Sequence, residues 1–438
     1  MKILKEHDRE VFKIIQSEFN RQKNTLEMIA SENFTDYSVL EAAGSVLTNK
    51  YAEGYPEKRY YGGCSEVDKI ENLAISRAKE LFNCEYANVQ PHSGSQANMG
   101  VFQAFLNPGD TVVGLSLAHG GHLTHGSNVN FSGKLYNFIN YGVTRDTHRI
   151  DFDALNKLVR SEKPQLIICG GSAYPRFIEF EKFKEIAEEN NIHLMADIAH
   201  PSGLIASGVH PSPWPYCDIV TSTTHKTLRG PRGGIILSGV DTENKFGIIA
   251  KKSGRTKLLS EIINSAIMPG IQGGPLMHII AAKAVAFKNA LSSSFKEYCN
   301  SMVDNAKELS ESLKSKDYNI VSGGTDTHLV LIDLTNKNIS GKKAEQILDK
   351  AGITVNKNMI PYDEKSPMIT SGIRIGTPAL TTRGMGLEEM HLISNLIDRA
   401  INSGSDEKVL NKIKAEVKEL CESNPLYMEM SNFEMSKM

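Results

Sequence analysis

The 438-residue chain lacks the features that would tie it to a membrane, to nucleic acid or to an oxidising compartment. No run approaches the roughly 18 consecutive apolar residues that span a bilayer. The net charge of −2 provides no basic field for nucleic acid or anionic lipid. The six cysteines form no CxxC pair, which favours a reducing cytosol over a disulfide framework or a zinc site. Residues 1–22 contain acidic side chains and no apolar signal core. We therefore expect a soluble, cytoplasmic protein without nucleic-acid or membrane partners.

Short apolar runs alternate with helical segments through the first two thirds of the chain. Strands are expected within 86–90, 110–115, 165–170, 193–199, 218–222 and 233–239, and helices within 95–106, 153–161 and 179–190. Such alternation predicts a mainly parallel sheet covered by helices on both faces. Further helices are expected over 5–20, 242–253 and 276–316. A capping box of Ser65 and Asp68 is expected to begin another helix, which ends near residue 82.

The C-terminal part has a different texture, which indicates a second, smaller domain. Alternating apolar residues at 328–334 are followed by a helix near 341–351, a strand at 372–378 and helices over 386–421. This pattern is typical of an α+β domain. The predicted boundaries are an N-terminal arm of residues 1–30, a large domain of residues 31–285 and a small domain of residues 286–438.

The stretch "TSTTHKTLRGPRGG", residues 221–234, places Lys226 between small hydroxyl residues and a glycine-rich turn. An amine becomes a useful nucleophile toward an aldehyde when burial or neighbouring positive charge lowers its pKa. His225, Arg229 and Arg232 could supply such charge. Small residues on both sides would admit a flat ligand. A lysine beside a histidine is more often structural, so the interpretation depends on other motifs.

Two of these motifs follow strand-like runs. In "QPHSGSQANMG", residues 90–100, Ser93, Gly94 and Ser95 would offer hydroxyls and backbone N–H groups to a phosphate at a helix N-terminus. An ordinary helix cap is the alternative. In "HLMADIAHPSG", residues 193–203, Asp197 ends an apolar strand, where open α/β sheets bind ligands. A protonated ring nitrogen would suit this carboxylate, and His200 could reach the same site. The alternative is an aspartate that caps a turn.

Three histidines, His119, His122 and His125, lie among glycines in "SLAHGGHLTHGS". Their spacing could suggest a metal site, but the Gly-Gly pair breaks helical geometry and no Glu or Cys completes a familiar ligand pattern. We expect no metal and favour an imidazole stacked on a flat ring. A phosphate cradle, a strand-end carboxylate, a stacking histidine and a nucleophilic lysine are together the parts that pyridoxal 5′-phosphate (PLP) requires.

The chain closely resembles the serine hydroxymethyltransferases over nearly its whole length. The resemblance runs through "LEMIASENFTDYSVLEAAGSVLTNKYAEGYPEKRYYGG" (26–63), "THKTLRGPRGG" (224–234) and "SGIRIGTPALTTRG" (371–384). It implies a PLP-dependent enzyme of fold type I. In this fold a large domain holds a mainly parallel, seven-stranded sheet between helices, and a small C-terminal α+β domain follows.

The resemblance also implies a cofactor site. Lys226 would carry PLP covalently with support from His225, and Asp197 would pair with the pyridine nitrogen. The remaining implied contacts are His122 stacked on the ring, His200 near the phenolic oxygen, Ser172 beside the cofactor, Ser93, Gly94 and Ser95 at the phosphate, and Gly273 reaching the phosphate from the neighbouring subunit.

Substrate groups follow from the same resemblance. Arg374, assisted by Ser31, would clamp the amino-acid carboxylate as a bidentate fork, although a lone strand arginine is more often a surface ion pair. Tyr51, Glu53 and Tyr61 would form the acid/base region and approach from the partner subunit, whereas a tyrosine-rich loop by itself is more often interface packing. Positions that would line a folate pocket are Leu117, Gly121, Leu123 and Asn358.

The implied activity is the reversible transfer of the hydroxymethyl carbon of L-serine to tetrahydrofolate, which gives glycine and 5,10-methylenetetrahydrofolate. Glu53 would handle the proton, and the enzyme would be a homodimer, or a tetramer, with shared active sites. One alternative is a folate-independent threonine-type aldolase, which would lack the "AEGYP" and "LAHGGHLTHG" elements. The other is a catalytically silent PLP-binding protein, which the presence of Lys226, Asp197 and Glu53 disfavours.

Overall fold

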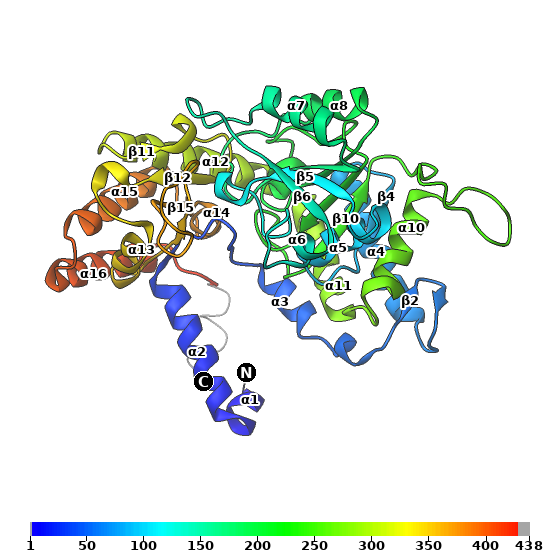
Figure 1. Ribbon diagram of the computed structural model, residues 1–438. Helices are drawn as coiled ribbons and strands as arrows, with labels where there is room; N and C mark the ends of the chain where they lie inside the picture. Colours follow the sequence, from blue (N-terminus) through cyan, green and yellow to red (C-terminus); the bar gives the residue numbers. More distant parts are fainter. Residues whose placement is uncertain (1, 428–438) are drawn as a thin grey trace. The chain divides into compact units, whose positions relative to one another are not determined.

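A computed structural model describes residues 2–427 of the chain (Figure 1). Contacts divide these residues into two compact units. One contains residues 34–300, and the other combines residues 2–33 with residues 301–427. The N-terminal segment therefore belongs with the C-terminal part, and helix α12, Ser293–Lys314, runs from one unit into the other. The division into an arm of residues 1–30, a large domain of residues 31–285 and a small domain of residues 286–438 stays a prediction.

The large unit is built on a seven-stranded sheet in the order β4-β10-β9-β8-β7-β5-β6. Its strands are β4 (Tyr86–Asn88), β5 (Thr111–Leu115), β6 (Asn137–Tyr141), β7 (Leu166–Cys169), β8 (His193–Asp197), β9 (Ile219–Thr223) and β10 (Gly234–Ser238). All neighbours are parallel except β10, which is antiparallel to both β9 and β4. Strands β7, β9 and β10 are buried along their whole length, as a sheet covered on both faces requires. The expected mainly parallel α/β sheet is thus confirmed.

Helices cover this sheet with apolar faces. In α5 (Gly94–Phe105), Ala97, Val101 and Phe105 recur at helical spacing and pack in one core with strand residues such as Ile168 and Ile236. The other helices of the large unit are α3 (Tyr37–Ala43), α4 (Ser65–Phe82), α6 (Phe131–Leu135), α7 (Phe152–Glu162), α8 (Phe180–Glu189), α9 (Ser202–Ala206), α10 (Leu259–Ser265) and α11 (Met277–Ala290). Short 3₁₀ turns lie at Val46–Asn49 and Leu117–His119, a π-helical turn lies at Ala266–Ile271, and the β2–β3 hairpin joins Gly54–Tyr55 to Lys58–Arg59.

The second unit contains a four-stranded antiparallel sheet in the order β11-β12-β15-β14. Its strands are β11 (Asn319–Ile320), β12 (Leu329–Asp333), β14 (Asn356–Asn358) and β15 (Gly372–Gly376), and β1 (Leu26–Glu27) pairs with β13 (Ile353–Thr354). Its helices are α1 (Lys2–His7), α2 (Arg9–Asn24), α13 (Gly341–Lys350), α14 (Pro378–Thr382), α15 (Leu387–Asn402) and α16 (Glu407–Ser423), with 3₁₀ turns at Val321–Gly323 and Thr335–Lys337. The predicted α+β character is what the structure contains.

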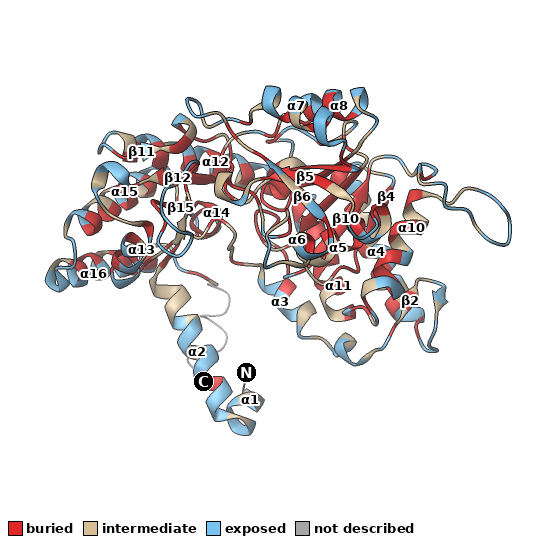
Figure 2. Ribbon diagram, viewed as in Figure 1, coloured by how far each residue is buried: buried red, intermediate tan, exposed pale blue. Residues whose placement is uncertain are grey.

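The buried guanidinium of Arg383 connects the N-terminal segment to the C-terminal end of α16. It donates to the carbonyls of Gln22, Lys23 and Thr25 on one side and to those of Cys421 and Asn424 on the other. One contiguous apolar core, which includes residues of β1, β12, β15, α13, α15 and α16, fills this unit. In Figure 2 the buried residues concentrate on the strands and on the inward sides of the helices.

Three details differ from the sequence-based expectations. No helix forms over 242–253. Instead, the side chain of Asn244 bonds the backbone of Phe246, Ile248 and Lys257 and closes a loop, because such local bonds compete with helix formation. The expected helix over 276–316 is two helices, α11 and α12. Strand β6 was not expected at all, and it forms the edge of the sheet beside β5.

The capping box expected at Ser65 is also wrong, although the helix begins there. Cys64 occupies the cap position and makes no side-chain cap bond. The carboxylate of Asp68 instead accepts from the amide of Glu57 at 3.0 Å and from Nε of Arg59 at 2.8 Å. A charged guanidinium is a stronger donor than a backbone amide at a helix end, so Asp68 pairs with the buried Arg59 and does not cap the helix.

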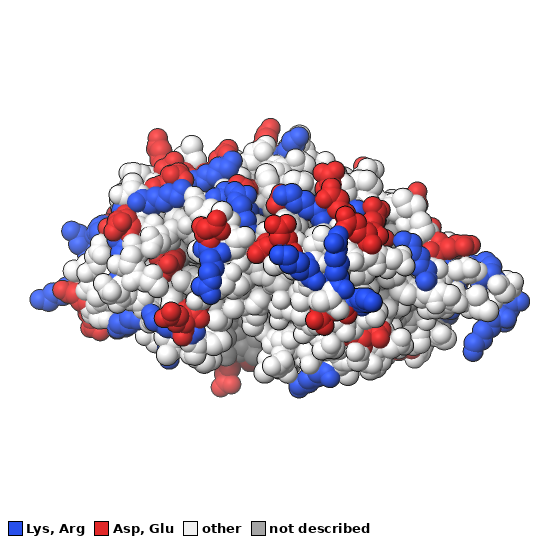
Figure 3. All heavy atoms as spheres, turned by 45° about the horizontal axis from the view of Figure 1, so that its top comes forward, with Lys and Arg blue, Asp and Glu red and all other residues white. Residues whose placement is uncertain are grey.

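On the face shown in Figure 3, Lys and Arg are interspersed with Asp and Glu. All six cysteines are free thiols. Among residues 2–427, no helix combines the length and the apolar character needed to cross a membrane.

Candidate active site

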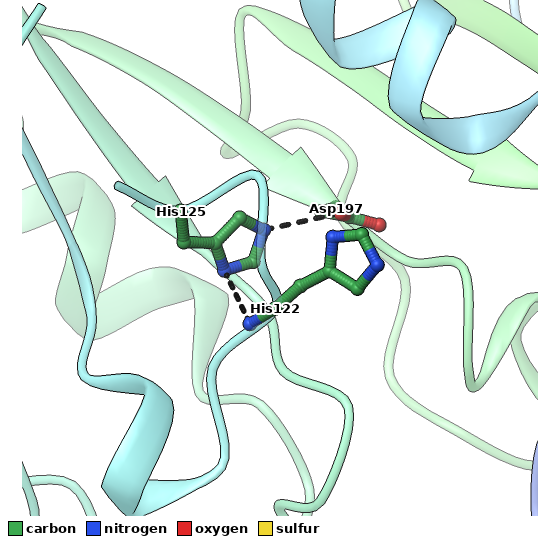
Figure 4. Close-up of side chains that lie close together, drawn as sticks. All are labelled: His122, His125 and Asp197. Carbon is green, nitrogen blue, oxygen red and sulfur yellow. Dashed lines mark hydrogen bonds and ion pairs between the residues drawn. The ribbon is translucent and has the colours of Figure 1, made fainter. Parts of the chain in front are cut away.

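Asp197, the last residue of β8, is a buried carboxylate surrounded by hydrogen-bond donors (Figure 4). Its Oδ2 accepts from Nδ2 of Asn98 at 2.9 Å and lies 3.1 Å from Nε2 of His125. Its Oδ1 accepts from the amide of Ala199 at 3.1 Å. Three donors from three segments therefore orient the carboxylate at the carboxyl end of the sheet, where open α/β folds bind ligands.

The hydrogen bond at Nδ1 of His125 indicates which ring nitrogen carries the proton. Nδ1 accepts the backbone N–H of His122 at 3.3 Å, so the ring proton resides on Nε2 and is donated to Asp197. The ring of His122 is fixed in a similar way, because its Nδ1 accepts from the amide of Thr124 at 3.2 Å. The two imidazoles meet edge to face, with ring centroids 5.8 Å apart. These backbone bonds thus define the orientations of both rings.

Burial by itself would raise the pKa of Asp197, because a low dielectric disfavours the charged form. The hydrogen bond from His125, the charges of His125 and His122 and the bond from Asn98 outweigh burial and hold the pKa below its ordinary value. The carboxylate is therefore ionised at neutral pH. An ionised, buried carboxylate is suited to a cationic ligand group.

His119, the third histidine of the sequence motif, does not join this group. Its Nδ1 accepts from the amide of Val143 at 3.2 Å, and burial lowers its pKa. Among the described residues, the ligand-type atoms that lie within 4.8 Å of one another are those of His122, His125 and Asp197. In that set the contact between His125 and Asp197 is a hydrogen bond that a metal ion would have to displace.

Lys226 lies in a loop directly after β9, the strand next to β8, and its residue is only 7% exposed. Its carbonyl accepts from the amide of Arg229, whose φ of 60° lies in the left-handed region. The neighbouring His225 is half-buried, and burial together with the positive charges of Lys226, Arg232 and Lys283 lowers its pKa to about 3. His225 is consequently a neutral imidazole at physiological pH. Its Nδ1 is buried and has no hydrogen-bond partner among the described residues.

The glycines after Lys226 have a structural task that the sequence did not reveal. A Cβ on Gly230 would lie 2.6 Å from the carbonyl oxygen of Thr224, and one on Gly233 would lie 2.4 Å from Cε of Lys283. A Cβ on Gly234 would lie 2.3 Å from the carbonyl oxygen of Ser93. These glycines therefore allow the loop to fold on itself and on its neighbours, in addition to any space that they leave for a ligand.

The N-terminus of α5 adjoins the same end of β9 and β10. Ser93 caps the helix, because its Oγ accepts from the amide of Gln96 at 3.2 Å. A Cβ on Gly94 would lie 2.7 Å from Cγ2 of Thr223, so only glycine permits this approach. Ser93 is thus the N-cap of α5. The first amides of a helix, here including that of Ser95, lack intrahelical acceptors, and this is the arrangement that commonly binds anions.

The remaining cofactor candidates of the large unit lie on loops at strand ends. The amide of Ser172, after β7, donates to the carbonyl of Gly120 at 2.7 Å. The carbonyl of buried His200, after β8, accepts from Oγ1 of Thr227 at 2.7 Å, which links this residue to the lysine loop. Of the folate candidates, Leu117 and Leu123 expose 41% and 47% of their surface, whereas Gly121 is buried.

Tyr51, Glu53 and Tyr61 form a separate, exposed cluster in the large unit. Tyr51 and Tyr61 expose about half of their surfaces and meet edge to face, with centroids 5.0 Å apart. The hydroxyl of Tyr51 donates to Oε1 of Glu53 at 3.1 Å, and this bond to the carboxylate raises the pKa of Tyr51. Gly273 completes the cluster, since a Cβ there would lie 3.0 Å from Oε1 of Glu53.

Arg59 fixes the loop that carries Glu53. Its Nη1 donates to the carbonyls of Ala52 and Gly54, each at 2.9 Å, on the two sides of Glu53. Its Nη2 donates to buried Glu71 at 2.6 Å. Two carboxylates, those of Glu71 and Asp68, thus anchor a buried guanidinium that orients the backbone around Glu53.

The other substrate candidates lie in the second unit. Arg374 is in the middle of β15, where burial lowers its pKa to about 10, and its Nε donates to Oδ1 of Asn356 at 3.2 Å. An arginine so deeply buried differs from the surface ion pair that a lone strand arginine usually forms. Ser31 follows β1, and Asn358 ends β14, where its side chain donates to the carbonyl of Met359 at 2.7 Å.

The sequence analysis missed several residues that position this site. His125 was considered only as one of three histidines that could bind a metal or stack on a ring, and Asn98, Arg59 and Lys283 were not singled out. Asn98 sits on the first turns of α5 in "GSQANMG", and a polar residue on the otherwise apolar face of that helix was the available signal. Lys283, in the apolar "IIAAKAVAF" of α11, gave a similar signal.

The fold and the site together define a class: a PLP-dependent enzyme of fold type I, with a buried carboxylate and a buried lysine after adjacent strands of a mainly parallel sheet. The chain belongs to the serine hydroxymethyltransferase family, whose model matches residues 4–397. A protein of Chlorobium phaeovibrioides (strain DSM 265 / 1930) named serine hydroxymethyltransferase is 58% identical over 429 residues, which are 97% of this chain and 97% of that protein.

The first prediction concerns the charge of Asp197. Replacement Asn98→Ala removes one donor to the carboxylate and should raise the pKa of Asp197 toward its ordinary value of 3.8. A carboxylate whose pKa is depressed on folding stabilises the protein above its unfolded-state pKa and loses that contribution as pH falls. The difference in unfolding free energy between wild type and variant should therefore be constant above about pH 5 and shrink below it. Urea unfolding of the apoprotein at several pH values measures this difference.

Thr221→Val is the matched control for this prediction. Thr221 donates to Oδ1 of Asn98 at 2.6 Å. Neither Asn98 nor Thr221 titrates, so any pH dependence in the Asn98→Ala difference arises from the groups that Asn98 contacts, of which Asp197 is an acid. A pH-dependent difference of the same size in Thr221→Val would contradict the assignment to Asp197.

Proposed function

We propose that the chain catalyses the reversible, PLP-dependent transfer of the hydroxymethyl carbon of L-serine to tetrahydrofolate, with glycine and 5,10-methylenetetrahydrofolate as products. The carrying observation is the pairing of an ionised, buried Asp197 with a lysine loop after the adjacent strand, in a chain that belongs to the serine hydroxymethyltransferase family over residues 4–397. Asp197 and Thr221 are register partners on β8 and β9, so the carboxylate and Lys226 emerge at the same end of the sheet.

The residues present fit PLP. The ionised carboxylate of Asp197 would hold a protonated pyridine nitrogen, and the fixed ring of His122 would stack on the pyridine. Ser93, Gly94 and Ser95, at the N-terminus of α5, would bind the phosphate. Ser172 and His200 would contact the ring, and Lys226 would form the covalent link. When bound, PLP supplies an electron sink for the carbanion that develops at Cα of the substrate.

His225 supports this assignment through its own chemistry. Because its pKa is lowered to about 3, the ring is neutral and adds no positive charge beside the nucleophilic amine. Its buried Nδ1 leaves a polar atom that a bound group would satisfy. We infer that His225 orients the cofactor and the lysine as a neutral hydrogen-bonding group and does not act as a cation.

Substrate recognition is assigned to both units. The guanidinium of Arg374, assisted by Ser31, would bind the carboxylate of serine as a bidentate fork, because burial removes competing water. The candidates for contacts with folate are the exposed leucines Leu117 and Leu123, with Gly121, in the large unit and Asn358 in the second unit. An apolar surface of this kind suits the flat ring of a pterin.

Glu53 would move the proton at the substrate hydroxyl, in hydrogen-bond contact with Tyr51 and next to Tyr61. The exposure of both tyrosines and the contact of Gly273 with Glu53 support a shared site, in which these four residues together complete the active site of a partner subunit. This arrangement requires a two-fold homodimer, alone or within a tetramer. A cytoplasmic location remains part of the proposal.

The second prediction separates this reaction from that of a folate-independent aldolase. Purified protein with PLP should form glycine from L-serine rapidly with tetrahydrofolate, and at least about 100-fold more slowly without it, because no acceptor is then present for the one-carbon unit. Glycine is measured by chromatography after quenching. Equal rates with and without tetrahydrofolate would favour the aldolase, and no glycine in either case would favour a silent PLP-binding protein.

The third prediction assigns the covalent link. Borohydride reduction of the PLP-loaded protein should attach the pyridoxyl group to Lys226, since this lysine is buried beside a neutral histidine in the loop after β9. Peptide mass mapping locates the label. Lys283 is the internal control, because it is also a buried lysine but its Nζ is occupied by three backbone carbonyls. A label on any lysine other than Lys226 would overturn the assignment.

The fourth prediction tests the shared site by mixing two inactive chains, Glu53→Gln and Lys226→Gln. Joint refolding gives about half heterodimers if pairing is random. If Glu53 acts in the partner's site, each heterodimer has one intact site, and activity should recover to about one quarter of the wild-type value. If Glu53 acts in its own subunit, every site keeps one lesion.

Affinity tags on the two chains verify that heterodimers have formed. Refolded Glu53→Gln alone and Lys226→Gln alone are the matched controls, and each should stay inactive. Absence of recovery in a sample that contains heterodimers would exclude the shared site while leaving the cofactor assignment intact.

A further inference from the structure

Lys283, on α11, is a buried lysine that the reaction described above does not use. The residue is only 1% exposed, although lysine is rarely buried without a partner. Its Nζ donates to the carbonyl of Val89 at 2.6 Å, to that of Pro91 at 3.0 Å and to that of Gly234 at 2.9 Å. The three hydrogens of the ammonium thus bond three backbone oxygens.

These three carbonyls favour the charged form of Lys283. Burial lowers the pKa of Lys283 to about 7, and the negative charge of Glu71 opposes this effect. A neutral amine has only two hydrogens to donate, so it would leave one of the three buried carbonyls without its bond. Each unsatisfied buried carbonyl destabilises the arrangement that holds it. The contacts therefore require the ammonium and hold it rigidly.

The three carbonyls belong to the segment that leads into the helix N-terminus of the candidate phosphate site. Val89 and Pro91 precede Ser93, the cap of α5, by four and two residues. Gly234, the first residue of β10, donates its amide to the carbonyl of Pro91 at 3.0 Å. Its Cα also approaches the carbonyl of Ser93, since a Cβ there would lie 2.3 Å from that oxygen. The ammonium of Lys283 joins β10 to the segment on which Ser93 depends.

The side chain of Lys283 packs closely against the backbone of Gly233. A Cβ on Gly233 would lie 2.4 Å from Cε and 3.0 Å from Nζ of Lys283, so the lysine stem fills the space beside a glycine. A second side chain, the amide of Gln272, supports the same segment. It accepts from the backbone N–H of His92 at 3.0 Å and donates to the carbonyl of Gln90 at 3.0 Å. Residues 89–93 are therefore held from both sides by buried polar groups.

We propose that Lys283 is a positioning residue for phosphate binding, which acts through three backbone carbonyls to hold residues 89–93, and hence the N-terminus of α5, in the geometry that accepts the cofactor phosphate. The proposal rests on the assignment of Ser93, Gly94 and Ser95 to the phosphate. Lys283 itself does not contact the cofactor in this proposal. Loss of the Lys283 side chain should lower the affinity for a phosphorylated cofactor. It should leave the affinity for the same ring without phosphate nearly unchanged.

The test compares binding of PLP and of pyridoxal, which lacks the phosphate, to apoprotein by absorbance titration. Lys283→Met has a similar length and no donors. It should weaken PLP binding roughly 10-fold or more, because three buried carbonyls lose their partner and the segment relaxes. Pyridoxal affinity should change by less than about twofold, because pyridoxal makes no use of the helix N-terminus.

Leu155→Ala is the matched control for general destabilisation. Leu155 is a fully buried residue of α7, and its truncation leaves a cavity in the core. It should lower the midpoint of urea unfolding but leave the ratio of PLP to pyridoxal affinity at the wild-type value. If Leu155→Ala shifts this ratio as far as Lys283→Met does, the effect is general and the proposal fails.

Two further variants keep the result interpretable. Lys283→Arg retains the charge but presents a planar fork, so it should show the same selective loss of PLP affinity at smaller size, and it decides the question if Lys283→Met does not fold. Ser95→Ala tests the phosphate assignment by itself. A normal affinity ratio in both Lys283 variants, with a lowered ratio in Ser95→Ala, would overturn the role of Lys283 alone. A normal ratio in Ser95→Ala would overturn the phosphate assignment.

Discussion

The candidate active site of the large unit depends on hydrogen bonds that stabilise buried charged side chains. Asp197 is ionised and buried because His125, Asn98 and the amide of Ala199 donate to it, and the side chains of His125 and Asn98 are themselves fixed by further bonds. Moving an isolated carboxylate from water into a protein interior costs several kcal/mol or more, so such a group persists only where its surroundings are rigid. The rigidity of β8, of the first turns of α5 and of the histidine loop is therefore part of the chemistry of the site.

A second buried charge is compensated in the opposite sense. The ammonium of Lys283 donates to three backbone carbonyls, whereas the carboxylate of Asp197 accepts from N–H donors. Each arrangement includes a group of a regular element, the carbonyl of Gly234 in β10 around Lys283 and the side chain of Asn98 on α5 at Asp197. Preorganised dipoles cost no reorganisation when charge develops during a reaction, which is why they contribute strongly to catalysis. The same constraint explains why Gly233 and Gly234 are needed, since a side chain at either position would displace these groups.

The sequence predicted the main elements because burial dictates their pattern. Continuous apolar runs such as "QLIICG" allowed β7 to be found, since a strand covered on both faces has no polar side. Prediction failed where one polar side chain redirected the backbone. Asn244 closes a loop at 242–253, and Arg59 draws Asp68 away from the helix end. Such choices depend on which nearby donor or acceptor a polar side chain bonds, so the pattern of apolar residues does not reveal them.

The candidate site divides in a similar way. Lys226 and Asp197 could be proposed because their motifs follow strands, and the carboxyl ends of parallel strands meet at one edge of the sheet. The residues that hold them in place, His125, Asn98 and Lys283, act through hydrogen bonds to backbone and to other side chains, which a sequence does not display. A polar residue on an otherwise apolar helix face is the sign that Asn98 and Lys283 share. In this chain that sign marks residues that orient the site, because most buried polar groups are hydrogen-bonded and so tie the elements that they join together.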